Sequence, residues 1–397
     1  MNGDIKLLDQ KCTGCAACYN VCPKNAITMQ YDKDKFKYPV IDSTKCINCH
    51  LCKKVCPIDK NDLFNEEDQK VFGGYNKDVE ILKQSTSGGA FSAIVDTFCD
   101  ENYVIFGVVS NGIYSYHDFI IDKNELSKFR QSKYVQSDVG DSYKKAKEFL
   151  KQGKKVLFSG TPCQIAGLKS FLNKEYNNLL LVEVICEGVP SPLYAEKYSS
   201  YICNKKKKDL DNLEYRFKDT KKWDFEVMKF NFKDGTSYKL DRWFNPFWNI
   251  WLKHLMSRPS CYECQFARKE RVADITLGDL WGVHLYCPDL YNKNRGASVI
   301  FVNTEKGLNV IKNSDKYLYY RELDIYDAIR YQGPLRTHIK DNPDKIEFMN
   351  DLHNMEYEEL IKKWYTKPSF KLLYSKYVWG NRQKMFVYNL THKKKGE

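Results

Sequence analysis

The sequence predicts a mixed α/β, or α+β, fold: a two-cluster ferredoxin-type domain, then a mixed-sheet body and a helical C-terminal extension. Three observations support this prediction. Two cysteine runs of the same spacing occur before residue 58, strand-like and helix-like segments alternate over residues 87–192, and residues 361–397 are strongly basic. We accordingly divide the chain into four parts, residues 1–66, 67–153, 154–320 and 321–397.

The composition predicts a globular protein of the cytosol. Of the 397 residues, 43% are hydrophobic and 14% aromatic, which is enough to bury a sizeable core. The polar start "MNGDIKLLDQKC" lacks an apolar signal segment, and the longest apolar run, "YVIFGVV", is far shorter than the roughly 18 residues of a membrane span. In a reducing compartment, clustered cysteines bind metal more often than they form disulfides.

The two cysteine runs, "CTGCAACYNVCP" at 12–23 and "CINCHLCKKVCP" at 46–57, both read C-x-x-C-x-x-C-x-x-x-C-P. Zinc, the alternative, usually takes its ligands as two separated pairs, whereas three closely spaced thiolates suit an iron–sulfur cube. In bacterial two-cluster ferredoxins, which residues 1–60 resemble, the fourth cysteine of each run binds the other cluster. The spacing thus predicts two 4Fe-4S clusters. Their ligands would be Cys12, Cys15, Cys18 and Cys56 for one cluster, and Cys46, Cys49, Cys52 and Cys22 for the other.

The polar stretch "DKNDLFNEEDQK" at 59–70 predicts a linker, and the body follows it. We expect a helix after "SGG", then a strand and a hairpin turn at Asn111-Gly112. Two further strand-then-turn units, "KKVLFSGTPCQIAGL" and "NNLLLVEVICEGVPSP", cover residues 154–168 and 177–192. Strands alternating with helices at this spacing predict a partly parallel sheet.

Four cysteines of the body form a third candidate cluster site. Cys163 and Cys186 directly follow apolar strands, where chemistry collects in such sheets. Cys261 and Cys264 form a C-x-x-C, which alone is equally consistent with a redox pair, a zinc site or two unrelated buried thiols. Four soft ligands in one half of the chain nevertheless predict a third 4Fe-4S cluster.

The ordered motifs carry a family resemblance. The tandem cysteine runs, "STSGGAFSAI", "SKYVQSD", "SGTPCQIAGL", "ICEGVPSP" and "CYECQFARKERVADITLGDLWG" resemble the coenzyme F-420 hydrogenase/dehydrogenase beta-subunit family over residues 1–310. The resemblance implies one bound FAD that exchanges electrons with the clusters, and a cluster beside the flavin. It does not name the substrate.

The residues themselves are consistent with a flavin. No G-x-G-x-x-G follows a strand, so a Rossmann nicotinamide site is not expected. The "SGG" segment at a helix start can receive a diphosphate, although such residues usually serve as a cap and a turn. Lys133 can neutralise a reduced flavin, the alternative being a solvated lysine beside a core tyrosine. With the resemblance, the candidate FAD contacts are Ser87, Gly88, Gly89, Lys133, Tyr134, Ser137, Ser159, Gly160 and Thr161.

We therefore expect an oxidoreductase that uses electrons from ferredoxin or another low-potential carrier to reduce a small organic substrate through FAD. Two alternatives stay open: an electron-relay subunit of a larger complex, and a deazaflavin (coenzyme F-420) oxidoreductase. No residue is assigned as a catalytic acid or base.

The C-terminal extension is basic and rich in aromatic residues. Residues 361–397 hold ten basic residues against the single acid Glu397, which is most of the formal net charge of +12. Such a stretch suits an anionic membrane surface or an acidic partner, and the alternative is a partly packed helical end. No nucleic-acid motif accompanies the charge, so nucleic acid is not an expected partner. The basic residues are Lys362, Lys363, Lys367, Lys371, Lys376, Arg382, Lys384, Lys393, Lys394 and Lys395.

Overall fold

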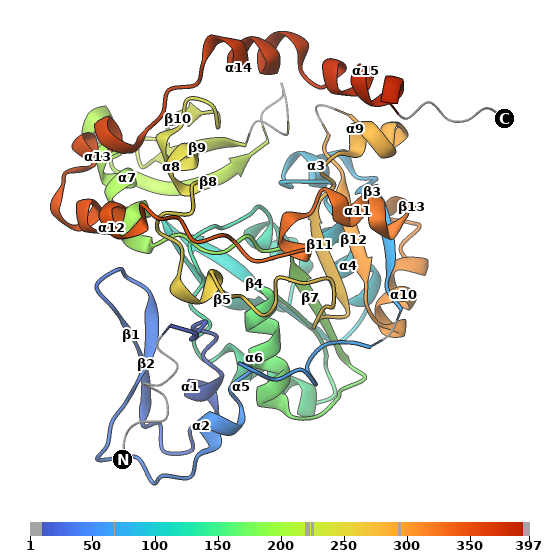
Figure 1. The fold of residues 1–397 in the computed structure, drawn as a ribbon. Coiled ribbons are helices and arrows are strands. Elements are labelled where there is room, and N and C mark those ends of the chain that lie inside the picture. The colour runs from blue at the N-terminus through green and yellow to red at the C-terminus, as the bar shows by residue number, and fades with distance from the viewer. Residues whose placement is uncertain (1–9, 67, 219–222, 224–225, 293–294, 392–397) are drawn as a thin grey trace.

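The cysteine runs fold into a small domain at one end of the molecule (Figure 1). The structure, a computed structural model, describes residues 10–66, 68–218, 223, 226–292 and 295–391. Each cysteine run contains one short helix that follows a residue of left-handed backbone, Ala16 (φ 60°) or His50 (φ 56°), so the sequence duplication is also a structural one. An antiparallel hairpin joins the two halves. The elements are α1 (Ala17–Val21), β1 (Ile27–Tyr31), β2 (Lys37–Ile41) and α2 (Leu51–Lys54).

The segment predicted to be a linker is packed against the body instead. Leu63 is buried, and its carbonyl oxygen accepts a hydrogen bond from Lys169 Nζ at 3.0 Å. The Asn65 amide donates to the Arg271 carbonyl oxygen at 2.9 Å. The polar composition suggested a free connection, but two apolar side chains, Leu63 and Phe64, join the core beneath it. The small domain is therefore held to the body along its connection.

One eight-stranded mixed sheet forms the body. Its order is β13-β3-β12-β11-β7-β6-β4-β5, and the four neighbours β4, β6, β7 and β11 pair in parallel. This confirms the predicted partly parallel sheet and the hairpin at Asn111-Gly112, where Gly112 has φ +61°. Strands from both sides of residue 153 enter the same sheet. The strands are β3 (Lys70–Asn76), β4 (Tyr103–Asn111), β5 (Tyr114–Ile120), β6 (Lys155–Gly160), β7 (Leu179–Val184), β11 (Ile275–Asp279), β12 (Ser298–Val302) and β13 (Leu318–Glu322).

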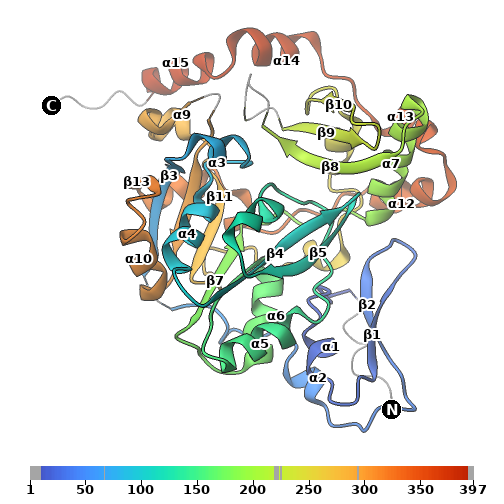
Figure 2. The ribbon, with the colours of Figure 1, turned by 180° about the vertical axis from the view of Figure 1, so that it is seen from behind.

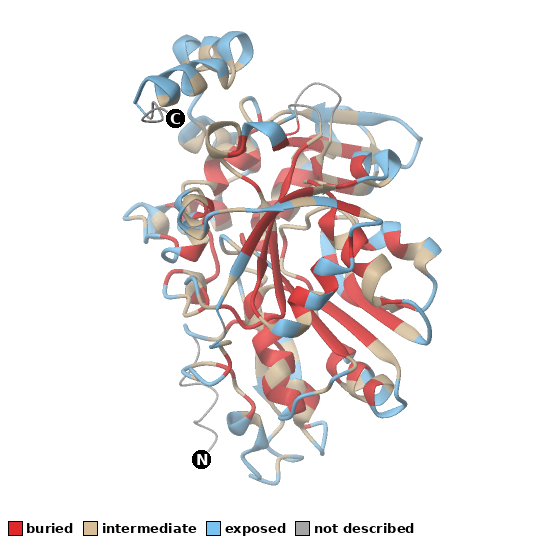
Figure 3. Ribbon diagram, turned by 90° about the vertical axis from the view of Figure 1, so that its right-hand side faces the viewer, coloured by how far each residue is buried: buried red, intermediate tan, exposed pale blue. Residues whose placement is uncertain are grey.

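Helices cover both faces of this sheet because successive strand residues point to opposite sides. In β4, Val104 and Phe106 pack toward α5 and α6, whereas Ile105 packs toward α4 and α10. The strands are consequently buried along both faces (Figure 3). The covering helices are α3 (Val79–Lys83), α4 (Ala90–Phe98), α5 (Ser142–Lys151), α6 (Pro162–Leu172), α9 (Val283–Tyr286), α10 (Glu305–Lys312) and α11 (Ile325–Arg330).

A second, three-stranded antiparallel sheet of order β10-β9-β8 builds a separate aromatic core. Tyr194, Tyr198, Phe247 and Trp248 are almost fully buried there. Helices α12 and α13 of the C-terminal extension close this core through Phe348 and neighbouring side chains. The elements are α7 (Pro192–Lys206), β8 (Leu210–Phe217), β9 (Val227–Phe232), β10 (Ser237–Leu240), α8 (Pro246–Trp251), α12 (Lys345–Asn354) and α13 (Tyr357–Trp364).

The last described segment runs across the top of the molecule (Figures 1 and 2). It comprises α14 (Phe370–Tyr374), a π-helical turn η7 (Ser375–Trp379) and α15 (Arg382–Thr391), which packs against α9. Lys393, Lys394 and Lys395 lie outside the described residues. Within the described part of the chain, every helix is too short or too polar to cross a bilayer. Association of this segment with a membrane surface stays a prediction.

Candidate iron-sulfur and flavin site

The structure brings together the four cysteines predicted for the first cluster. Burial raises the pKa of the Cys15 thiol, and the charges of Cys56 and Cys12 raise it further. The Cys18 thiol behaves in the same way, with burial as the largest cause and Cys15, Cys12 and Cys56 as its charged neighbours. A nearby cation, such as the iron of a cluster, would favour the thiolate form of these buried thiols. These four residues therefore form a suitable ligand set for one 4Fe-4S cluster.

The second set lies nearer to solvent. Burial raises the pKa of the Cys52 thiol, and Cys49 and Cys46 add to this effect through their charges. Cys22 directly follows α1, as Cys56 follows the corresponding run around α2, and its Sγ accepts a hydrogen bond from the Ala26 amide at 3.3 Å. Cys56, the last cysteine of the second run, lies with the first set. By the internal duplication, we expect Cys22, the last cysteine of the first run, to belong to the second set.

The four body cysteines lie together as well. Burial raises the pKa of the Cys186 thiol, and the charges of Cys261, Cys163 and Cys264 raise it further. Two loops are joined to achieve this: the Arg258 amide donates to the Val189 carbonyl oxygen at 3.0 Å, and Pro190 forms a bridge with Ser257. The loop after β7 and the C-x-x-C loop are thereby held side by side.

Among the described residues, no three His, Cys, Asp or Glu side chains converge closely enough to hold one metal ion. A 4Fe-4S cluster binds each thiolate through a different corner of a cube, so its ligands stand further apart than those of a mononuclear site. Which cysteine binds which cluster remains a prediction.

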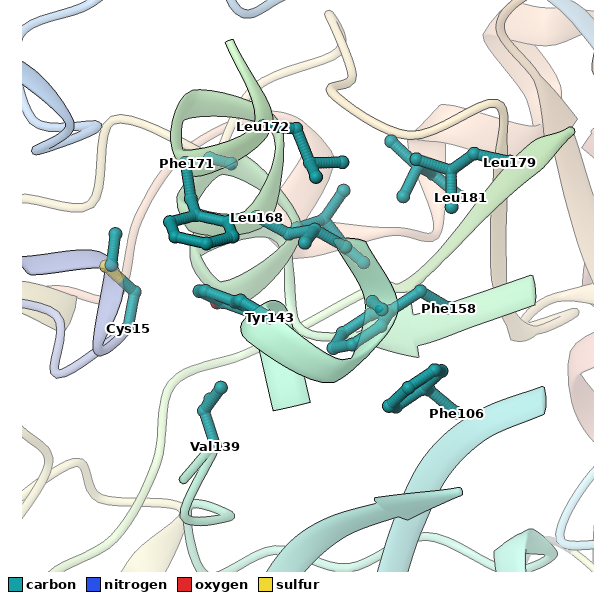
Figure 4. Packing of buried hydrophobic residues seen from close by; sticks show 14 of the residues in the cluster. Cys15, Phe106, Val139, Tyr143, Phe158, Leu168, Phe171, Leu172, Leu179 and Leu181 are labelled. Carbon is teal, nitrogen blue, oxygen red and sulfur yellow. The ribbon is translucent and has the colours of Figure 1, made fainter. Parts of the chain in front are cut away.

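The first and third thiol sets are neighbours. The charge of Cys163 is one of the causes that raise the pKa of Cys15. Cys163 is in the first turn of α6, and Cys15 lies against the side of that helix near Tyr143 and Phe171 (Figure 4). A Cβ atom at Gly167 of α6 would come within 3.0 Å of Cys15 Sγ, so a glycine is needed for this close approach. The small domain therefore presents its more buried thiols to the body.

A cavity of about 550 Å³ begins where this series of thiols ends. It lies at the carboxyl ends of the parallel strands, and Cys186 is part of its wall. Of the candidate FAD contacts, all but Gly88 line it. The structure thus gathers into one cavity three segments that are far apart in the sequence: 85–92, 129–137 and 159–161.

Several of these candidate contacts also hold the local fold. Ser87 Oγ donates to the Ala297 carbonyl oxygen at 2.6 Å, and the Gly88 amide donates to Ser298 Oγ at 3.0 Å. A Cβ atom at Gly88 would come within 2.5 Å of the β3 backbone, so Gly88 serves this close contact. The hydroxyl of Ser137 is hydrogen-bonded to buried His117. The side chains of Ser87 and Ser137 are thus already hydrogen-bonded within the protein, so these segments would contact a ligand largely through their backbone.

Lys133 is the most distinctive of the predicted residues. Its Nζ donates to the carbonyl oxygens of Arg130 (2.5 Å) and Lys128 (3.2 Å), and burial lowers its pKa to about 7. An anion placed nearby would restore the protonated form, because an opposite charge favours it. Tyr134 packs edge-on against Trp248 and Trp251, with ring centroids 4.8 and 5.1 Å apart, so it has the core role named as the alternative while still lining the cavity.

Three important residues of the cavity were not among the predicted contacts: Arg216 and Trp248, which stand outside every quoted motif, and Asp279, which lies within the motif that ends at Gly282. Arg216 Nη1 pairs with Asp279 Oδ2 at 2.5 Å, and the Arg216 side chain is 4% exposed. Its Nε and Nη2 atoms have no hydrogen-bond partner among the described residues. The Tyr134 hydroxyl also interacts with this guanidinium, so Arg216 is a buried cation in the cavity wall with polar neighbours on more than one side.

Two family models match the chain. Residues 11–60 match the "4Fe-4S dicluster domain", and residues 153–325 match the model of the C terminus of the coenzyme F420 hydrogenase/dehydrogenase beta subunit. These matches support the predicted relationship to the coenzyme F420 hydrogenase/dehydrogenase beta-subunit family. It is thus an iron–sulfur protein related to oxidoreductases, with a dicluster domain that binds 4Fe-4S clusters. The sequence resemblance is confirmed.

A solved structure is also similar. It is a chain of the F420-reducing [NiFe] hydrogenase complex from Methanosarcina barkeri, determined after xenon derivatization. The two share 14% sequence identity with a TM-score of 0.43, and the alignment covers 76% of this chain and 93% of that one. None of the curated proteins matches this chain. The segment from residue 326 onward lies outside both family models.

Proposed function

We propose that this chain is an iron–sulfur flavoprotein reductase. It takes single electrons from ferredoxin or an equivalent low-potential donor and delivers them through FAD to a small organic substrate. One observation carries the proposal: the three thiol sets form a series that ends at Cys186, in the wall of the cavity that also holds Lys133. Clusters of this ferredoxin type have low potentials, and such electrons favour reduction.

The volume of the cavity and the residues that line it support a flavin dinucleotide as its ligand. Its volume of about 550 Å³ lies in the usual range for ligand sites. The start of α4, next to Gly89, offers backbone amides for the diphosphate, and the buried walls supply aromatic rings. Arg216 supplies a buried positive charge in the cavity wall. The site is therefore suited to an anionic, ring-bearing cofactor.

FAD, when bound, supplies the step from one-electron to two-electron chemistry: two electrons that arrive singly leave together with one proton as a hydride. The chain's own residues supply the rest. The thiol sets would hold the electron carriers, Lys133 would place a positive charge near the cofactor, and Arg216 would interact with an acceptor atom. A second proton, taken from solvent, completes the reduction of the substrate.

The test uses full-length protein purified and reconstituted without oxygen. We expect about one FAD per chain and bleaching of the flavin absorbance when reduced ferredoxin is added. Lys133→Ala should weaken FAD binding about tenfold, since a charged hydrogen-bonding group is removed. Lys128→Ala, a neighbouring exposed lysine paired with Glu125, is the matched control and should bind FAD normally. Protein that holds its iron but takes up no FAD would contradict the proposal.

A further inference from the structure

A second cavity, of about 560 Å³, adjoins the first. The two share Arg242, Trp281 and Tyr331 as wall residues. The ring of Tyr331 packs closely against Gly282, where a Cβ atom would lie within 2.6 Å of the ring, so this packing needs a residue without a side chain. A molecule in the second cavity would therefore lie next to whatever occupies the first.

The C-terminal segment forms the outer wall of this second cavity, as α14 and α15 bridge the space between the β8–β10 sheet and α9 (Figures 1 and 2). The bridge is attached at both sides. The Tyr377 hydroxyl donates to Asp241 Oδ2, and Asn381 Nδ2 donates to the Tyr291 hydroxyl at 3.2 Å. Gly380 makes the turn between η7 and α15 with φ +56°. This wall belongs to the part of the chain that neither family model covers.

The charge of the cavity is one-sided. Four cations line it, and the described lining residues include no carboxylate. Arg242 forms an ion pair with Glu226 at 2.8 Å. Lys384 and Lys376 lie close enough to His284 for their charges to affect its pKa. Burial and the charges of these two lysines lower the pKa of His284 to about 4, so this histidine is neutral near pH 7. Among the described lining residues, Arg382 and Lys384 of α15 therefore contribute positive charge with no carboxylate beside them in the lining, which favours an anionic ligand. The four cations are Arg242, Lys376, Arg382 and Lys384.

Aromatic rings and buried nitrogen atoms complete the lining of the second cavity. Trp243, Trp281 and Trp379 contribute indole rings, and Lys376 Nζ lies 4.9 Å from the ring centre of Trp243. Trp243 Nε1 and His284 Nε2 are buried and have no hydrogen-bond partner among the described residues. Indole faces and unpaired donors favour a ligand with a flat or sugar ring that also carries hydrogen-bond acceptors.

We propose that this second cavity binds the substrate, and that the substrate is a small organic anion: a ring carrying a carboxylate or a phosphate group. The ring would lie against the indoles, and the anion would face Arg382 and Lys384 of α15. This inference rests on the proposed function, because the cavity is a substrate site only if the adjoining one holds the flavin. It assigns to the C-terminal segment a role in selecting substrate.

The test measures binding of phenyl phosphate to the full-length, cofactor-loaded protein by calorimetry. Phenol, which has the ring alone, and inorganic phosphate, which has the charge alone, are the matched ligands. We expect phenyl phosphate to bind at least about tenfold tighter than either. The double variant Arg382→Ala/Lys384→Ala should weaken phenyl phosphate binding by about tenfold or more. Lys367→Ala/Lys371→Ala, which removes two exposed cations outside both cavities, should bind it as the wild type does.

Two results would overturn the inference. One is binding of phenyl phosphate that is unchanged in Arg382→Ala/Lys384→Ala. The other is a variant that loses binding to phosphatidylglycerol vesicles but keeps its binding of phenyl phosphate. That result would assign these cations to a membrane surface instead. The FAD content of each sample is read from its absorbance. Normal FAD content with no selective anion binding contradicts this inference only, whereas absence of FAD contradicts the proposed function.

Discussion

Arg258 Nε donates a hydrogen bond to the carbonyl oxygen of Cys12 at 2.8 Å, so a residue of the body is tied directly to a predicted ligand of the first cluster. The same guanidinium donates to the Lys37 carbonyl oxygen at 2.9 Å and to Gln136 Oε1 at 3.0 Å. Arg258 is 1% exposed and stacks 4.3 Å from the ring centre of Tyr38. Together with Gln265, which donates to the Pro57 carbonyl oxygen at 2.8 Å, it is a polar link between the small domain and the third thiol set.

Replacing Arg258 by methionine should loosen this link. Buried carbonyl oxygens would lose their donor, at a cost of roughly 1–3 kcal/mol each, and the melting temperature should fall. Electron delivery from the small domain to the flavin should slow in stopped-flow measurements with reduced ferredoxin. Arg321→Met removes an exposed arginine that pairs with Asp289 and serves as the control. Equal rates in both variants would contradict a docking role for Arg258.

The third cluster can be counted by iron analysis. Anaerobically reconstituted protein should hold about twelve iron atoms per chain, four for each of three clusters. Cys261→Ser/Cys264→Ser should lower this to about eight, because two of the four predicted ligands are lost. Cys203→Ser, which changes a half-buried thiol outside the three sets, should keep about twelve. A wild-type value near eight would leave the body without a cluster.

Gly167→Ala tests the close packing of the first cluster loop on α6. The new methyl group would come within 2.9 Å of the Tyr143 hydroxyl and 3.0 Å of Cys15 Sγ. Overpacking of this kind costs about 1–3 kcal/mol, more than the gain of about 1 kcal/mol from alanine in a helix. We expect a lower melting temperature. Gly333→Ala has open space around its added methyl group, so its melting temperature should change little. An unchanged melting temperature in Gly167→Ala would show that the cluster loop can move to make room for the methyl group.

The pH dependence of stability should include a contribution from His117. Its Nε2 lies 3.1 Å from the Ser159 carbonyl oxygen and its Nδ1 lies 3.1 Å from Ser137 Oγ. Burial lowers the pKa of His117 to about 4, while Ser159 and the charge of Asp138 act weakly in the opposite direction. Below the unfolded-state pKa, His117 is protonated in the unfolded chain but stays neutral in the folded chain. Stability is therefore full above that pKa and is lost as the pH falls toward 4.

One pH unit below the unfolded pKa, this loss amounts to about 1.4 kcal/mol. It is measured as the change in melting temperature between pH 7.5 and 5.5 under anaerobic conditions. His117→Gln removes the titrating group, so its melting temperature should depend less steeply on pH over this range. The comparison uses the slopes rather than the absolute values, because the variant itself can be less stable. Parallel slopes would exclude His117 as the titrating group.

The sequence by itself determined the features that depend on neighbours in the chain. Within each run the first three thiols are three residues apart, so one loop brings these three together whatever the rest of the fold does. Short continuous apolar runs determined the strands, and hence the location of Cys163 and Cys186 just after β6 and β7. These parts could be predicted because their geometry is encoded over fewer than about a dozen residues.

Only the tertiary structure decided which distant segments meet. Arg216 on β8 and Asp279 on β11 form their buried pair across 63 residues, and Lys384 reaches the second cavity from the far end of the chain. The segment at 59–70 has a polar composition, yet Leu63 finds an apolar site on α6. A side chain's partners in such contacts depend on how whole elements pack, because burial of apolar faces decides that packing and no local spacing records it.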